Sequence, residues 1–264
     1  MNIEMIRAAA ARAHGHVRRT PFVSSPFLDW IAGRRVWIKA ECVQHTGSFK
    51  YRGAWSAISA LDPAQRARGI FAYSSGNHAQ AVARAAHLHG APAVILMPAD
   101  APALKIANTR ALGAEVVTYD RATGDRDALG MQLAEERGLT LIKPFDNAQV
   151  IAGQGTCGLE IAAQAAEHGI AQADVLVCCG GGGLTSGIAL AFEADAPGLR
   201  VRPVEPEGFD DAARSLISGK IERNAQMSGN ICDAIIGPVV GDMTFPILHR
   251  LCGPGLTVSE DEAL

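Results

Sequence analysis

A short apolar run, a glycine or polar turn and an alanine-rich stretch recur along the chain, and this repeat constrains the fold most. The apolar runs do not alternate with polar residues, which is typical of strands covered on both faces. Helices between such strands predict right-handed crossovers and a parallel sheet. The expected strands begin at Gly69 and cover 93–97, 115–119, 139–142, 174–178 and 199–204; the expected helices cover 78–89, 103–112, 125–137, 154–168 and 185–194.

The repeat is interrupted between Leu141 and Gly155, where Pro144 and polar residues stand. We therefore predict an α/β protein with two open parallel-sheet domains, a small one of residues 61–146 and a large one of residues 1–60 plus 147–264. From Thr257 to Leu264 the chain reads as a strand followed by a helix N-cap at Ser259. Because an α/β domain rarely ends in the opening turn of a helix, the large domain is expected to be truncated at its C-terminus.

Composition excludes several classes of protein. The 264 residues are 48% hydrophobic and 19% charged, with a formal net charge of -3. This balance favours a compact core and gives no general attraction to nucleic acid or to anionic membranes. No apolar run reaches the roughly 18 residues of a membrane span. The six cysteines lack metal-binding or disulfide spacing, so buried, reduced thiols in a cytoplasmic protein are expected.

The first motif with chemical potential is Gln44–Gly53, in which a polar turn places Lys50 at the start of an apolar helical stretch. The positive end of the helix dipole disfavours a protonated lysine. A neutral amine is what attack on a carbonyl requires. From spacing alone, however, a solvated surface lysine is the more common explanation.

Two further turns join a strand to a helix. Ser74–His78 offers backbone N–H groups and small side chains where an anion could bind, although an ordinary capped turn explains it equally well. Cys179–Gly187 contains four consecutive glycines, and such a costly run favours close approach of a phosphate to bare backbone. A dinucleotide fold is the rival interpretation of this loop, but the G-x-G-x-x-G spacing fails and no Walker sequence follows.

An acidic turn spans Val204–Asp211. Clustered carboxylates can bind a hard cation through oxygen ligands, whereas most such runs are solvated loops.

Taken together, these motifs resemble the fold type II pyridoxal-phosphate enzymes, specifically the serine/threonine dehydratase and serine racemase group, whose fold is tryptophan synthase beta-like. The resemblance extends over essentially the whole chain. It rests on Thr46–Gly53, Ser74–Gln80, Met97–Pro102, Lys105–Ala114, Ile151–Thr156, the tetraglycine loop and Val204–Glu207.

The resemblance implies a role for each matching residue. Lys50 would carry pyridoxal 5'-phosphate covalently and transfer protons at the substrate Cα. Phe49 would pack against the cofactor ring, and Asn77 would hydrogen-bond its 3-hydroxyl. The phosphate would lie on the backbone of Gly180, Gly181, Gly182 and Gly183. The loop formed by Ser74, Ser75, Asn77 and His78 would bind the substrate carboxylate.

The resemblance also implies a divalent cation, Mg²⁺ or Ca²⁺, held by Glu205, the carbonyl of Phe209 and Asp211, and a homodimer or homotetramer. The implied reaction converts L-threonine or L-serine to a 2-oxo acid and ammonia. 3-Hydroxyaspartate is an alternative substrate. Serine racemisation is another alternative, because Ser75 could act as a second catalytic base opposite Lys50.

The sequence departs from the family pattern near its end. Family members normally continue further and there supply a small polar residue to the pyridine nitrogen, and no motif here matches it. A catalytically dead cofactor-binding protein is therefore the alternative of a different class. No regulatory domain is recognised, so feedback by isoleucine is not expected.

Overall fold

The computed structural model describes residues 1–120, 124–226 and 228–264. The first part of the chain contains α1 (Ile3–Ala13), β1 (Phe22–Ser24), α2 (Pro26–Ala32), β2 (Trp37–Lys39), the 3-10 turns η1 (Glu41–Val43) and η2 (His45–Gly47), and α3 (Lys50–Ser59). Strands β1 and β2 form an antiparallel pair that the sequence interpretation did not include.

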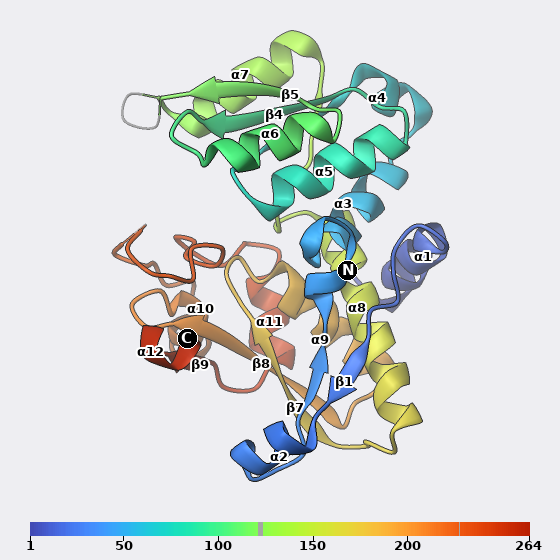
Figure 1. The fold of residues 1–264 in the computed structure, drawn as a ribbon, viewed down its shortest axis with the longest axis vertical. Helices are drawn as coiled ribbons and strands as arrows, with labels where there is room; N and C mark the ends of the chain where they lie inside the picture. Colours follow the sequence, from blue (N-terminus) through green and yellow to red (C-terminus); the bar gives the residue numbers. More distant parts are fainter. Residues whose placement is uncertain (121–123, 227) are drawn as a thin grey trace.

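The second part forms a four-stranded parallel sheet in the order β5-β4-β3-β6. Its elements are α4 (Pro63–Arg68), β3 (Ile70–Tyr73), α5 (Asn77–Leu88), β4 (Ala93–Pro98), α6 (Ala103–Ala111), β5 (Glu115–Tyr119), α7 (Arg126–Arg137) and β6 (Thr140–Leu141). In Figure 1 this sheet and its helices form the upper part of the molecule.

The third part forms a parallel sheet in the order β7-β8-β9. It contains α8 (Ala148–Glu167), β7 (Ala173–Cys178), α9 (Gly183–Asp195), β8 (Leu199–Pro206), α10 (Asp211–Ser218), α11 (Phe245–Leu251), β9 (Leu256–Val258) and α12 (Glu260–Ala263). The two parallel sheets confirm the predicted fold class, and Figure 1 shows this sheet below the first. The division at residues 60 and 146 stays a prediction.

Helix α3 lies between the two parts and is buried on nearly every side. Tyr51, Ala54 and Ile58 belong to the core that includes α5, β3 and β4. On another side, glycines allow α3 and α8 to approach closely: a Cβ on Gly153 would lie 2.4 Å from the Arg52 carbonyl oxygen. The element that carries Lys50 is therefore fixed by both parts of the molecule.

Helix α8 begins six residues before the predicted start. Asn147 caps it by accepting hydrogen bonds from the N–H groups of Gln149 and Val150. Glycine disfavours helix interiors, so Gly153 and Gly155 weigh against a helix at these positions. Here they lie inside the helix and permit close packing, since a Cβ on Gly187 of α9 would lie 2.5 Å from the Gly155 nitrogen. Packing has overridden propensity at this point.

Two smaller observations complete the fold. Among the described residues, no helix has both the length and the apolar character needed to cross a bilayer.

All six cysteines are free, and Cys157 and Cys179 are buried as expected. Cys42 and Cys178 are exposed, so the expectation of buried thiols is wrong for these two. Cys178 lies on the exposed face of β7 together with Asp174 and Leu176.

Candidate active site

Lys50 is the first residue of α3 and follows the two 3-10 turns. Its side chain is half-buried, and Nζ donates a hydrogen bond of 2.9 Å to the carbonyl oxygen of Pro144. The same Nζ lies 5.3 Å from the centroid of the Phe49 ring. The two residues predicted to carry and to flank the cofactor are therefore adjacent in space.

The environment of Lys50 favours the neutral amine. Burial lowers the pKa of Lys50 to about 8, although the nearby Cys178 acts in the opposite direction. The position at the first turn of α3 also disfavours a positive charge, because the N-terminal end of a helix is itself positive. Lys50 is thus a lysine with substantial nucleophilic character near neutral pH.

Arg52 anchors the helix that carries Lys50, and the sequence interpretation missed it. Its guanidinium is 1% exposed and forms two hydrogen bonds of 2.7 Å with Glu41. It forms two more with Glu160 of α8, at 2.8 and 2.9 Å. Lys39 of β2 also donates to Glu160. This largely buried network of two cations and two anions fixes α3 against η1, β2 and α8. Its only sequence signal is charge within an apolar stretch.

The loop from Ser74 to His78 joins β3 to α5. Ser74 Oγ accepts a hydrogen bond of 3.2 Å from the Gly76 N–H, and Asn77 is the exposed first residue of α5. Ser75 is half-buried. The loop thus presents two serine side chains, an amide and the N-terminal N–H groups of a helix, a combination suited to a carboxylate.

His78 is oriented differently from the rest of this loop. Its ring is buried, and Nε2 lies 2.9 Å from the Ile142 carbonyl oxygen. Burial, together with the charge of Lys50, lowers the pKa of His78 to about 3. The imidazole is therefore neutral and donates to a carbonyl. The hydrogen bond of its side chain stabilises the fold, and the role of His78 in the substrate-binding loop stays a prediction.

The glycine loop lies between β7 and α9. Gly182 has φ +84°, a conformation that favours glycine, and α9 begins at Gly183. A Cβ on Gly181 would lie 2.3 Å from the ring of Phe145, and one on Gly180 would lie 3.3 Å from Ile235 Cα. The loop therefore has no room for side chains at Gly180 and Gly181. The first N–H groups of α9 have no acceptor within the helix and are free to bind an anion.

Residues Pro144 and Phe145 connect the lysine to the glycine loop. Pro144 accepts the hydrogen bond from Lys50, while the next residue packs against Gly181 and Gly183. The sequence interpretation treated this segment only as a crossing between domains. No local pattern in the sequence pointed to this contact.

The predicted cation ligands are close together and buried. Glu205 is on β8 rather than in a turn, and its two carboxylate oxygens accept hydrogen bonds from the N–H groups of Ala212 and Ala213. Burial raises the pKa of Glu205 to about 8 and that of Asp211 to about 6. Asp211 Oδ2 is buried without a hydrogen-bond partner. Two neighbouring acids and an unpaired oxygen fit a divalent cation.

A cation here would also need carbonyl and water ligands. In the described part of the chain, no cluster of three His, Cys, Asp or Glu side chains could hold a metal ion. The carbonyl of Phe209, itself a buried residue, is the predicted third protein ligand.

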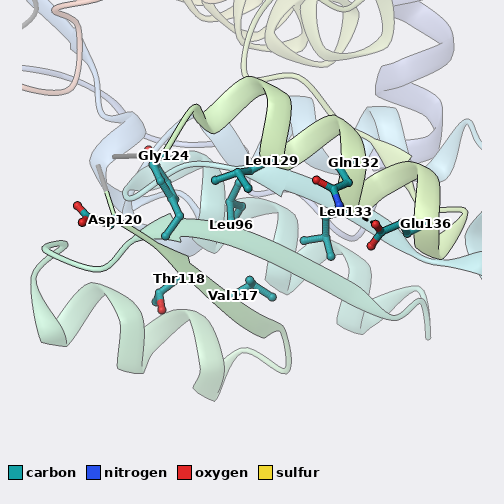
Figure 2. A pocket seen from close by; sticks show the side chains of 10 residues that line it. Leu96, Val117, Thr118, Asp120, Gly124, Leu129, Gln132, Leu133 and Glu136 are labelled. Atoms are coloured by element: carbon teal, nitrogen blue, oxygen red, sulfur yellow. Dashed lines mark hydrogen bonds between the residues drawn. The ribbon is translucent and has the colours of Figure 1, made fainter. Parts of the chain in front are cut away.

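A separate cavity of about 410 Å³ lies between α7 and strands β4 and β5 (Figure 2). It is lined by Leu96, Val117, Thr118, Tyr119, Asp120, Gly124, Leu129, Gln132, Leu133 and Glu136. None of these is among the predicted site residues.

Comparison with known proteins agrees with the fold and with the resemblance seen in the motifs. A family model described as "Pyridoxal-phosphate dependent enzyme" matches residues 13–264. An L-threo-3-hydroxyaspartate ammonia-lyase from Pseudomonas sp is 46% identical over 96% of this chain and 78% of its own length. A serine racemase from Oryza sativa subsp. indica is 38% identical over 98% of this chain and 75% of its own length. The crystal structure of a threonine deaminase from T.th. has a TM-score of 0.93 and 45% identity, covering 99% of this chain and 83% of that one.

The fold and the lysine–glycine-loop site define a pyridoxal-phosphate-dependent α/β enzyme, and the chain belongs to that family. Within the family it is a fold type II, ammonia-lyase-like enzyme of the group that contains serine racemases, threonine deaminases and hydroxyaspartate ammonia-lyases. The recognition made from the motifs is confirmed, and the dinucleotide interpretation of the glycine loop is set aside.

The residues present fit pyridoxal phosphate. Lys50 provides an amine with a lowered pKa, and the adjacent Phe49 ring provides an apolar surface. Gly180–Gly183 provide bare backbone at the start of α9, where an anion is favoured. The individual assignments of Asn77 and of the loop serines to cofactor and substrate stay predictions.

Proposed function

We propose that this chain eliminates ammonia from a small β-hydroxy amino acid, L-threonine or L-serine, and so yields a 2-oxo acid. The observation that carries the proposal is the half-buried Lys50 amine, with its pKa lowered to about 8, held next to the segment that packs on the glycine loop. The Cα proton and the β-hydroxyl would leave as water, and the released enamine would then take up water to give the 2-oxo acid and ammonia. A β-hydroxyl is therefore required as the leaving group.

When bound, pyridoxal phosphate supplies an electron sink for the electron pair left at the substrate Cα. Lys50 would hold the cofactor, and its released amine would remove the Cα proton. Gly180–Gly183 and the N-terminus of α9 would hold the phosphate, and Asn77 would orient the ring through its 3-hydroxyl. Ser74 and Ser75 would bind the substrate carboxylate.

The identity of the β-substituent is tested by comparing substrates. Purified protein loaded with pyridoxal phosphate is incubated with L-threonine, L-serine and L-threo-3-hydroxyaspartate, and 2-oxo acid and ammonia are measured. We expect product from threonine and serine. Product from 3-hydroxyaspartate alone would instead favour the activity named for the relatives at 46% and 42% identity. No product from any of them, with cofactor bound, would reject elimination and support a catalytically dead binding protein.

Serine racemisation is a second candidate, favoured by the half-buried Ser75 in the loop that precedes α5. If Ser75 is a catalytic base, Ser75→Ala reduces racemisation of serine by about a hundredfold or more while the chain still binds cofactor. Chiral analysis of serine after incubation measures this effect. An unchanged enantiomer ratio with the unmodified protein would reject the racemase.

We further propose a divalent cation at Glu205 and Asp211, because burial of both carboxylates and the unpaired Oδ2 of Asp211 favour a positive charge there. A homodimer or homotetramer is also predicted, and sedimentation analysis of the holoenzyme tests it.

A further inference from the structure

Residues 229–237, here called the strap, lie against the glycine loop. The strap is anchored at its C-terminal end, where Asn224 Nδ2 donates to the carbonyl of Gly237 at 2.8 Å. The Ile235 N–H donates to the Cys232 carbonyl at 3.0 Å, which makes a turn at its centre. Because a Cβ on Gly180 would lie 3.3 Å from the Cα and carbonyl oxygen of Ile235, the strap backbone covers the first glycine of the loop.

The strap also contacts the other part of the molecule. Asp233 Oδ2 lies 3.9 Å from Nζ of Lys105, which is on α6 beside the four-stranded sheet. The two side chains are 73% and 41% exposed. Figure 1 shows the strap, in orange-red, rising from the lower part of the molecule toward the upper part. An ion pair thus joins the strap to α6, in the same part of the molecule as Ser74 and Asn77.

From this geometry we propose that Lys105 and Asp233 are positioning residues that hold the strap on the phosphate cradle and dock the four-stranded part against it. The inference rests on the proposed role of Gly180–Gly183 as the phosphate site. The Lys105 ammonium and the Asp233 carboxylate would form this ion pair only while the strap covers Gly180 and α6 lies close to the strap. The ion pair therefore couples retention of the cofactor to the approach of the two parts.

Exposure limits the size of the effect. Solvated ion pairs contribute little and are screened by salt, so loss of this pair corresponds to about a threefold to fivefold change in an equilibrium or rate. Such a change is enough to measure as faster release of cofactor, and too small to unfold the protein.

The experiment measures release of pyridoxal phosphate from the holoenzyme after dilution at low ionic strength, followed by cofactor absorbance. We expect Lys105→Gln and Asp233→Asn each to accelerate release about threefold to fivefold, and the double variant to release no faster than either single one. The charge-exchanged variant K105D/D233K is expected to restore slow release.

A matched control is available within the same part of the molecule. Arg137 Nη1 pairs with Glu115 at 2.9 Å, and these side chains are 42% and 53% exposed. Arg137→Gln removes an ion pair of similar exposure that does not touch the strap, so release is expected to stay unchanged. Added salt is expected to accelerate release more in the unmodified protein than in Lys105→Gln.

The outcomes separate this inference from the proposed function. If the unmodified protein binds no pyridoxal phosphate, the proposed function fails and the positioning role falls with it. If cofactor binds but both single variants release it at the unmodified rate, only the positioning role is overturned. The same conclusion follows if K105D/D233K releases as fast as the single variants, because a merely structural effect of each substitution would not be corrected by exchanging the charges.

Discussion

At the scale of single residues, the chemistry of the site depends on how burial changes ordinary side chains. Lys50 gains nucleophilic character because desolvation lowers its pKa to about 8. His78 loses its charge for the same reason and becomes a donor to a carbonyl. The charge of Lys50 contributes to the lowered pKa of His78, so the two residues lie close together. Their roles nevertheless differ: Lys50 is the candidate catalytic amine, and the His78 side chain stabilises the fold.

The lowered pKa of Lys50 predicts how attachment of the cofactor depends on pH. At pH 7 about one lysine in ten would be neutral, against roughly one in three thousand for an ordinary lysine. The rate at which apoprotein captures pyridoxal phosphate is therefore expected to rise about tenfold from pH 6 to pH 7 and to level off above about pH 8. Stopped-flow absorbance measures the rate.

Lys50→Ala is the control for this profile, and the exposed Lys143→Ala is the matched lysine variant. Only the first should abolish capture. A capture rate that still rises steeply between pH 9 and pH 10 would show that Lys50 titrates as an ordinary lysine.

At the scale of elements, the glycine loop shows why a run of four glycines is retained. Gly181 is required by the Phe145 ring, and Gly182 by its positive φ. Both glycines lie between the end of β7 and the start of α9. The absence of side chains there permits close packing and leaves the backbone N–H groups accessible.

Gly181→Ala is expected to weaken cofactor binding about tenfold or more, because the new Cβ would force the Phe145 ring out of a packed position. Titration of apoprotein with pyridoxal phosphate measures the affinity. Gly253→Ala is the control, since its Cβ would meet only the exposed, flexible side chain of Arg200. Equal affinities of the two variants for pyridoxal phosphate would contradict the proposed phosphate site at Gly180–Gly183.

The acidic pair on β8 and α10 gives a prediction for stability. A buried Glu205 whose pKa is raised to about 8 binds a proton that the unfolded chain has released above its ordinary value of 4.5. Without a divalent cation, this stabilisation is complete below pH 4.5 and is lost as the pH rises through about 8. Asp211 acts in the same direction: its contribution is complete below pH 3.8 and is lost as the pH rises through its raised pKa of about 6.

Ca²⁺ or Mg²⁺ is therefore expected to raise the midpoint of thermal unfolding more at pH 8 than at pH 5, because only the ionised acids bind it. The variant Glu205→Gln serves as the comparison and is expected to lose this response. A cation effect that is the same at both pH values in both proteins would rule out this site.

At the scale of the whole molecule, the buried charge network unites segments that are distant in sequence. Lys39, Glu41, Arg52 and Glu160 belong to β2, η1, α3 and α8. The network determines how α3 packs against α8, and so where Lys50 lies.

Removal of the Arg52 guanidinium is expected to cost about 3–5 kcal/mol in the free energy of unfolding, because the largely buried Glu41 loses its ion-pair partner and Glu160 keeps only Lys39. Urea unfolding of Arg52→Ala measures this cost. Arg200→Ala, which breaks the exposed pair with Asp174, provides the control and is expected to change little. Similar losses of unfolding free energy in the two variants would show that the Arg52 network stabilises the protein no more than an exposed ion pair does.

The sequence by itself predicted the alternating strands and helices from Gly69 to Val204 and the parallel sheets, and its combined motifs predicted the roles of Lys50 and the glycine loop. These depend on local pattern: apolar runs, caps such as Ser259, and glycines where a turn needs them. Only the tertiary structure decided that Lys50 meets Pro144, 94 residues away, that Phe145 packs on Gly181, and that the His78 ring faces Ile142. Such contacts depend on how distant segments pack against one another. The local sequence around a residue does not specify which distant residues it will contact.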